Sequence, residues 1–211
     1  MHGRAFIMLA ALFVIGLLWR PDDTFAAGTN QAGRPPEWAI RRTKPGLPNL
    51  HQVTTNLYRG AQPMAAGMAE LKAMGVKTII DLRAYHSDKD ELGKAGSDLK
   101  PKRLQMNAWH AEDEDVIRFL KTVNDTNNLP AFVHCQHGAD RTGVMCAMYR
   151  ITTCGWTRQE AIDEMTQGGF GFHPMWKNLV TYLKRVDVEK IKREAGIATK
   201  PNSPNEQKPG K

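Results

Sequence analysis

The chain has 211 residues, enough for one domain with short extensions and a proper core, but too few for two domains of ordinary size. Its 29 Lys and Arg outnumber its 22 Asp and Glu, a positive balance that suits an anionic substrate or surface. It would also suit nucleic acid, but no zinc-ligand spacing, recognition helix or alternation of aromatic and basic residues is present, so we expect no nucleic-acid partner.

Residues 1–27 have the composition of a targeting segment. Arg4 precedes an apolar run over residues 5–19, which is shorter than the roughly 20 residues that span a bilayer. Small residues at 24 and 26 fit a signal-peptidase site. We expect an exported, periplasmic protein, with membrane association through an uncleaved anchor at residues 5–19 as the alternative.

Periodic patterns over residues 50–195 predict the folded domain, between a Gly- and Pro-rich linker at 28–49 and a disordered tail at 196–211. The predicted strands are 53–58, 76–82, 103–108 and 129–133, and the predicted helices are 64–74, 116–123, 143–154, 161–167 and one that starts at 174. Because strands and helices alternate, we predict an α/β domain with a mostly parallel central sheet flanked by helices.

The segment between the strand at 129–133 and the helix at 143–154 begins with His134-Cys135 and ends with Arg141-Thr142-Gly143. If this loop curls back, several backbone N–H groups and the positive end of the helix converge on one anion site, with Cys135 at its floor. A helix N-terminus and a nearby arginine both stabilise a thiolate. Arg141 can hold two phosphate oxygens at once. The loop therefore predicts a nucleophilic sulfur beneath a bound phosphoryl group.

This arrangement resembles the signature of the cysteine-dependent protein tyrosine and dual-specificity phosphatases. Residues 57–63, 75–83 and 168–171 also resemble segments of the small atypical bacterial branch, which includes an exported tyrosine phosphatase, and the resemblance covers roughly residues 50–185. It implies a protein tyrosine phosphatase-like fold of the dual-specificity type. It also implies hydrolysis of phosphate monoesters of tyrosine, and of serine or threonine, through a phosphocysteine, with no metal or cofactor.

The resemblance implies that Cys135 is the nucleophile, that Arg141 binds phosphate and that the Thr142 hydroxyl donates to the sulfur. The remaining residues expected around the phosphate are Gln136, His137, Gly138, Ala139 and Asp140. The Asp140 carboxylate must point outward, because it would otherwise repel the anion.

In this family the leaving group receives its proton from an acid on the loop after the preceding strand. The only acidic cluster in that position is at 112–115, where we place Asp113 first, Glu112 second and Asp115 third. The chain has no Trp-Pro-Asp triplet there. The same residues could instead cap the next helix and pair with its dipole.

The expected partner is a phosphorylated protein or a small anionic phosphate ester. One alternative keeps the chemistry but acts on an inositol phosphate or phosphoinositide. A second alternative is a protein that binds phosphorylated ligands without turnover, and a rhodanese-type sulfur carrier would leave Arg141 unexplained. Cys146 and Cys154 lie about 12 Å apart along one predicted helix, too far for a disulfide, so we expect free thiols.

Overall fold

The computed structural model describes residues 35–93, 98–107 and 109–198. The predicted targeting segment at 1–27 lies outside these residues, as does most of the predicted tail. Within the described ranges, no helix is long and apolar enough to cross a membrane.

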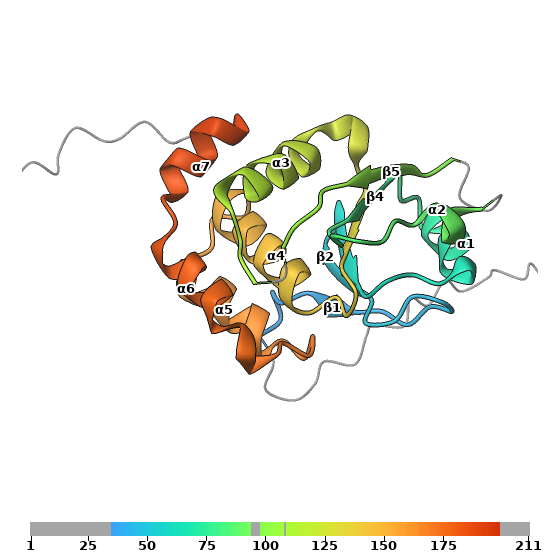
Figure 1. Cartoon of the computed structure of the whole chain (residues 1–211), viewed down its shortest axis with the longest axis horizontal. Helices are drawn as coiled ribbons and strands as arrows, with labels where there is room; N and C mark the ends of the chain where they lie inside the picture. The colour runs from blue at the N-terminus through green and yellow to red at the C-terminus, as the bar shows by residue number, and fades with distance from the viewer. Residues whose placement is uncertain (1–34, 94–97, 108, 199–211) are drawn as a thin grey trace, which may run out of the picture.

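A six-stranded sheet with the order β1-β2-β3-β6-β4-β5 forms the centre of the domain (Figure 1). Its strands are β1 (Ile40–Arg41), β2 (His51–Thr54), β3 (Leu57–Gly60), β4 (Thr78–Asp81), β5 (Lys100–Arg103) and β6 (Ala131–His134). Strands β3, β6, β4 and β5 are parallel, whereas β1 and β2 pair antiparallel at one edge. This confirms the predicted mostly parallel sheet.

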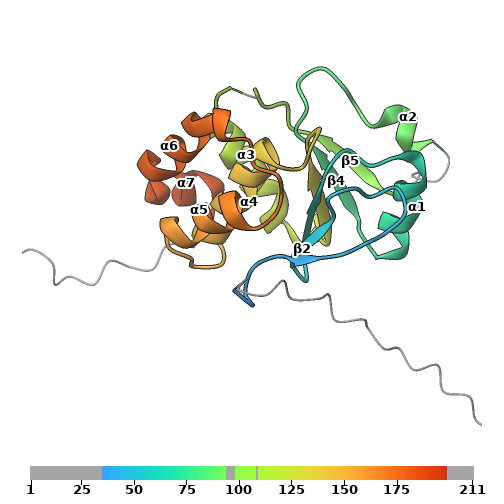
Figure 2. The same ribbon diagram turned by 90° about the horizontal axis from the view of Figure 1, so that it is seen from below.

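Helices cover both faces of the sheet (Figure 2). On one face lie α1 (Ala65–Ala73) and α2 (Lys89–Leu92), and on the other lie α3 (Asp113–Asn124), α4 (Asp140–Thr152), α5 (Arg158–Gln167), α6 (Lys177–Arg185) and α7 (Val188–Ala195). Short 3₁₀ turns occur at Thr126–Asn128 and Pro174–Trp176. Helix α5 begins with a capping box between Thr157 and Glu160.

The core has two parts because side chains alternate along the two central strands. Ile80 and Val133 belong to the larger hydrophobic cluster, with α3 to α7. Ile79 and Phe132 belong to the smaller one, with α1. Helix α4 is buried along nearly its whole length, so the loop that precedes it is fixed at both ends by buried structure.

Two predicted strands differ from the observed ones. The segment predicted as one edge strand at 53–58 is a hairpin, and its second strand, β3, lies inside the sheet next to β6. The strand predicted at 103–108 lies earlier, at β5. All four residues of β5 are exposed, so this edge strand carries no apolar alternation from which it could have been recognised.

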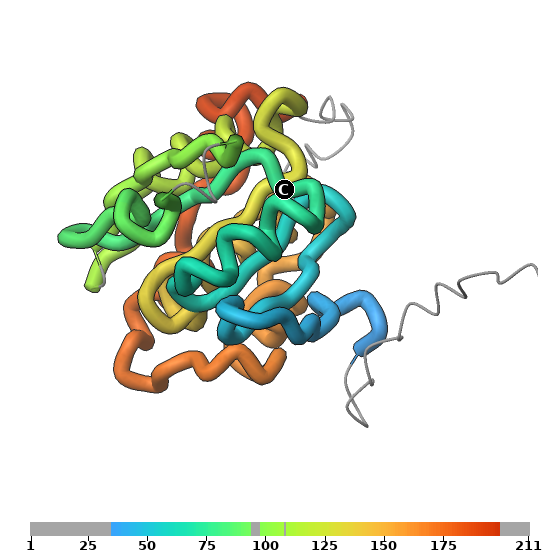
Figure 3. The backbone as a smooth tube through the Cα atoms, turned by 90° about the vertical axis from the view of Figure 1, so that its right-hand side faces the viewer, coloured from blue at the N-terminus to red at the C-terminus, as the bar shows by residue number. Residues whose placement is uncertain are grey.

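The described part of the predicted linker at 28–49 belongs to the domain. Ala39 and Leu47 are buried, and the N–H of Met64, just before α1, donates to Gly46 O at 2.9 Å. Figure 3 shows this segment, in blue, running alongside α1. A few buried apolar residues anchor an otherwise irregular chain, and composition alone does not reveal such anchors.

Candidate active site

The loop between β6 and α4 lies at the carboxyl end of a central parallel strand, where open α/β sheets bind their ligands. Cys135 is the first residue after β6 and is 2% exposed. Helix α4 begins five residues later, at Asp140, and its N-terminus faces the loop. The strand, loop and helix predicted from the sequence are confirmed.

Four consecutive carbonyl oxygens of this loop accept hydrogen bonds from outside it. The pairs are Gln62 N–H to Gln136 O at 3.2 Å, Asn49 Nδ2 to His137 O at 2.9 Å, and Arg59 Nη2 to Gly138 O at 2.8 Å and to Ala139 O at 3.4 Å. In a trans peptide the N–H points opposite to the C=O. The N–H groups of residues 137–140 are therefore directed toward the inner side of the loop, as an oxyanion cradle requires.

Gly138 allows the loop to approach the end of β3 closely. Its φ is +70°, and a Cβ added there would lie 2.3 Å from the carbonyl carbon and oxygen of Gly60. Any side chain would push the loop away from β3. The position therefore requires glycine for both its backbone conformation and its contact distance.

Arg59, in β3, supports the loop through its carbonyl oxygens. The sequence alone did not identify it as a residue of the site. It is 1% exposed, and its guanidinium lies 3.7 Å from the ring centroid of Phe170 in addition to binding the two loop carbonyls. Its position in a segment that resembles the phosphatase branch was the only available signal. A buried positive charge at this place also favours an anion above the loop.

Arg141 and Thr142 lie in the first turn of α4. Arg141 is half-buried, and its Nη1 lies 3.5 Å from Leu82 O at the end of β4. The Thr142 hydroxyl is fully buried and has no hydrogen-bond partner among the described residues. The predicted hydrogen bond from Thr142 to the Cys135 sulfur is thus not formed in this state, although a buried hydroxyl without a partner gains from finding one.

A buried charged network lies beneath Cys135. His134 Nδ1 lies 3.2 Å from Cys135 O, and since a carbonyl can only accept, Nδ1 is the donor. His134 Nε2 lies 2.8 Å from Asp88 Oδ2, and Arg83 binds the other oxygen of Asp88 and both oxygens of Asp81. Burial alone would lower the pKa of Arg83, but the hydrogen bond and charge of Asp81, with the charge of Asp88, raise it.

This network also contains a set of metal-type ligands. Asp81, Asp88 and His134 offer atoms within 4.8 Å of one another, and all three residues are buried. Arg83, however, binds both carboxylates and already supplies the positive charge that a cation would bring. The arrangement fits a salt-bridge network that fixes the floor of the loop.

The Asp140 carboxylate, which we expected to point outward, is paired with His173. Its Oδ1 accepts from the His173 N–H at 2.9 Å, and its Oδ2 accepts from His173 Nδ1 at 2.8 Å. The His173 ring lies edge-on to the ring of His137, with centroids 5.4 Å apart. Asn49 Nδ2 donates to Phe170 O as well as to the loop, so the segment 168–173 is tied to the loop at several points.

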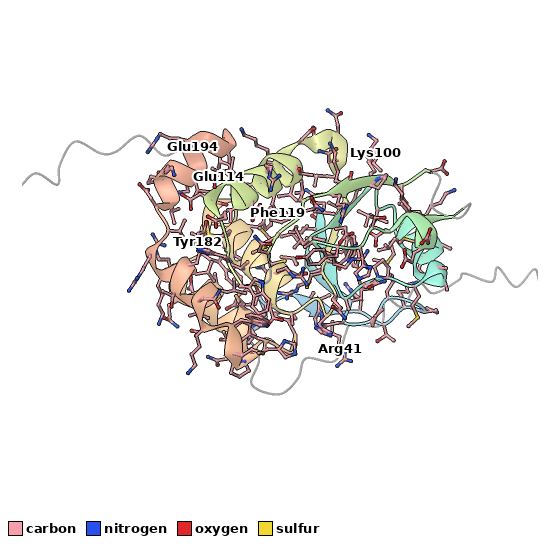
Figure 4. The ribbon with its side chains drawn as sticks, in the orientation of Figure 1. Arg41, Lys100, Glu114, Phe119, Tyr182 and Glu194 are labelled. Atoms are coloured by element: carbon pink, nitrogen blue, oxygen red, sulfur yellow. The ribbon has the colours of Figure 1, made fainter. Side chains whose placement is uncertain are left out.

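The three predicted acids have different surroundings. Asp113, the first choice, accepts from Tyr182 Oη at 3.0 Å and pairs with Lys190 Nζ at 2.9 Å. Figure 4 shows Tyr182 on α6 beside the first turn of α3. Burial, followed by the charge of Asp113, raises the pKa of Tyr182, which therefore stays a donor. These contacts count against Asp113 as the acid, although that role stays a prediction.

Asp113 also faces a cavity of about 550 Å³ that is separate from the loop. This cavity is lined by His110, Asn178 and Tyr182, together with further residues of α6 and the segment after it, and by none of residues 135–141. Asp115 is held by Arg118 one turn further along α3. Glu112 is exposed, 3.7 Å from His110 Nε2.

Comparison with known proteins agrees with the geometry of this site. Residues 43–178 match the family described as DSP-PTPase phosphatase fused to NAD+ kinase. The chain is 32% identical over 187 residues to the dual specificity protein phosphatase TpbA of Pseudomonas aeruginosa, a match that covers 88% of this chain and 82% of TpbA.

Solved structures of phosphatases are also similar to this chain. The crystal structure of P. aeruginosa TpbA superposes with a TM-score of 0.68 at 31% identity, over 76% of this chain and 98% of that one. Its cysteine-to-serine variant in complex with phosphotyrosine also gives 0.68, over 77% and 98%. The catalytic core of the PP-IP phosphatase SIW14 of S. cerevisiae, with a TM-score of 0.62 at 20% identity over 73% and 94%, shows the shared fold alone.

Proposed function

The chain is a cysteine-based phosphatase of the dual-specificity family, and we propose that it hydrolyses phosphotyrosine, and also phosphoserine or phosphothreonine, through a covalent intermediate on Cys135. The observation that carries this proposal is the outward orientation of four consecutive loop carbonyls, which leaves the N–H groups to bind the phosphoryl oxygens. The phosphotyrosine complex of the TpbA variant supports the choice of substrate.

In the first step Cys135 Sγ attacks phosphorus while the loop amides and the Arg141 guanidinium hold the non-bridging oxygens. The oxygen of the alcohol or phenol leaves with the electrons of the broken P–O bond. In the second step water attacks the phosphocysteine, and the sulfur leaves as a thiolate. The buried network of His134, Asp88 and Arg83 keeps the sulfur in place by fixing the backbone on either side of it.

Two features of the site favour a phosphomonoester of a protein over an inositol phosphate. The signature loop at 135–141 contains no lysine that could hold further phosphates. The rings of His137 and His173 stand at its rim and offer flat surfaces to the aryl group of a phosphotyrosine.

Two cysteine variants test the nucleophile. We expect Cys135→Ser to abolish release of inorganic phosphate while it retains binding of a phosphotyrosine peptide. Cys154→Ser is the matched control, since Cys154 is a free, half-buried thiol beyond α4, and it should keep wild-type turnover. Undiminished hydrolysis by Cys135→Ser would reject the assignment.

A substrate panel tests the specificity. Purified protein is compared on phosphotyrosine, phosphoserine and phosphothreonine peptides and on an inositol phosphate at matched concentrations. We expect the highest kcat/KM on the phosphotyrosine peptide. A higher kcat/KM on the inositol phosphate would replace the proposed substrate class, and binding of all four ligands without turnover would contradict the enzymatic proposal.

A further inference from the structure

The pair formed by Asp140 and His173 has the geometry of a carboxylate that orients a proton-transferring histidine. The carboxylate receives both the backbone N–H and the ring Nδ1 of His173, at 2.9 and 2.8 Å. Because each carboxylate oxygen is an acceptor, Nδ1 carries the hydrogen of this bond. A histidine held in this way through Nδ1 presents its other nitrogen, Nε2, for proton exchange.

The remaining nitrogen of His173 is open to a ligand. Nε2 forms no hydrogen bond with residues in the described ranges, and the side chain is 45% exposed. Asp140 directly precedes the phosphate-binding Arg141, and the His173 ring meets that of His137, a residue of the loop itself. The imidazole therefore stands at the rim of the phosphate site.

Two of the three acids predicted from the sequence have partners that hold them elsewhere. Asp113 is bound by Tyr182 and Lys190, and Asp115 is bound by Arg118. Of the acids predicted from the sequence, Glu112 alone is left exposed on its loop. A reaction that expels a phenoxide still requires a proton, because the tyrosine hydroxyl has a pKa of about 10.

We propose that His173 is a catalytic residue of the phosphatase reaction, which transfers protons in both steps, and that Asp140 is its positioning residue; this inference rests on the function proposed above. In the first step the Cys135 S–P bond forms, the P–O bond to the leaving group breaks, and His173 Nε2 gives its proton to the leaving oxygen. The imidazole is then neutral.

The second step returns the proton. A water molecule attacks phosphorus, gives one proton to His173 Nε2, and displaces the sulfur, which takes the electron pair of the S–P bond. The products are inorganic phosphate, the Cys135 thiolate and a protonated His173. The cycle balances without a metal ion or further reactant.

The test exploits the dependence of the first step on the leaving group. Steady-state kinetics of wild type and His173→Gln are measured with a phosphotyrosine peptide, whose leaving group needs a proton, and with 4-nitrophenyl phosphate, whose leaving group does not. We expect His173→Gln to lower kcat/KM on the peptide by roughly 10²–10³-fold, and on 4-nitrophenyl phosphate by less than about tenfold. A rapid burst of 4-nitrophenol followed by slow turnover should appear in the variant, because the second step is slowed as well.

Three further variants separate the alternatives. Asp140→Asn should show the same selective loss to a smaller extent, because it weakens the orientation of the ring. Glu112→Gln and Asp113→Asn should keep the wild-type ratio of the two substrates. Thermal unfolding of each variant reports whether the fold is retained.

The outcomes are distinct. An equal loss on both substrates in both His173→Gln and Asp140→Asn would mean that the pair only holds the loop, and would overturn the inference while the proposed function stands. A selective loss in Glu112→Gln instead would assign the proton to that residue. Failure of the wild-type protein to turn over either substrate would overturn both.

Discussion

Replacing Gly138 with alanine tests whether contact with β3 sets the shape of the phosphate-binding loop. The residue has φ +70°, a conformation that costs an L-residue roughly 1–2 kcal/mol. The added Cβ would lie 2.3 Å from the backbone of Gly60 and 2.5 Å from Ala61 N, whereas ordinary contact begins at 3.4 Å. Because the opposing atoms are backbone atoms of a central strand and the residue after it, the loop must move by about 1 Å.

A displacement of this size affects both catalysis and stability. Misplacing reacting groups by about 1 Å costs on the order of 10²-fold in rate. We therefore expect Gly138→Ala to lower kcat/KM on 4-nitrophenyl phosphate by about 10²-fold, with a fall of a few kcal/mol in the free energy of unfolding. The loss should be present on the activated substrate, because it reflects phosphoryl binding and attack by sulfur and not proton transfer.

Gly155→Ala provides the control for backbone strain. Gly155 has φ +76°, but a Cβ there would meet nothing within 4 Å. This variant should lose about 1 kcal/mol of stability and keep wild-type kcat/KM. If Gly138→Ala also retained wild-type kcat/KM, the close approach of the loop to β3 would not determine the geometry of the site, and the argument from the outward carbonyls would lose its support.

Three further predictions concern other parts of the chain. Tyr182→Phe should lower the free energy of unfolding by about 0.5–1.5 kcal/mol and leave kcat/KM unchanged, because it removes only the hydroxyl bound to Asp113; a fall in kcat/KM would place Asp113 in the reaction. Iodoacetamide at neutral pH should modify Cys135, with protection by phosphate, and spare Cys146, because burial raises the pKa of Cys146 to about 11 and leaves roughly 10⁻⁴ of it as thiolate. Peptide mass mapping reads out the labelling, and the reverse pattern would contradict it. In a Gram-negative host the mature protein should be recovered from the periplasm without residues 1–27, and an intact N-terminus on cytoplasmic protein would refute export.

The sequence predicts the loop because its determinants are contiguous. An apolar strand, a cysteine, a glycine, an arginine and a buried helix follow one another within about twenty residues, and each local signal agrees with the next. The same holds for α5, whose capping box is formed by residues three apart. Such features require no knowledge of what is packed against them.

The supports of the loop could not be predicted in the same way, because they come from distant parts of the chain. Asn49 and Arg59 bind carbonyls of residues 79 to 88 positions later, and Asp88 binds a histidine 46 positions away. Asn49 lies at the end of a segment whose composition indicated a linker. Only the tertiary structure shows that these polar side chains are the partners of loop carbonyls.

The same reasoning explains why the partners of Asp113 could not be predicted from its position in the sequence. Helix α7 was not predicted separately, so neither Lys190 nor its distance from the first turn of α3 entered the argument. An acidic first turn always satisfies the helix dipole, and here it also joins α3 to α6 and α7. The position of a carboxylate in the sequence is therefore weak evidence of catalysis unless the partners of that carboxylate are known.

Two carboxylates lie next to a site that must attract a doubly charged anion, and the structure shows how each is prevented from repelling it. Asp88 is bound by Arg83 and by His134, and Asp140 is bound by the backbone and ring of His173. An unpaired carboxylate about 4 Å from a bound anion would repel it by roughly 4 kcal/mol near a protein surface. Pairing removes this repulsion at both positions and at the same time fixes a histidine on each side of the loop. The carboxylates thus contribute to the site by holding cationic or hydrogen-bonding groups in place, which is why Asp140 is compatible with its position directly before Arg141.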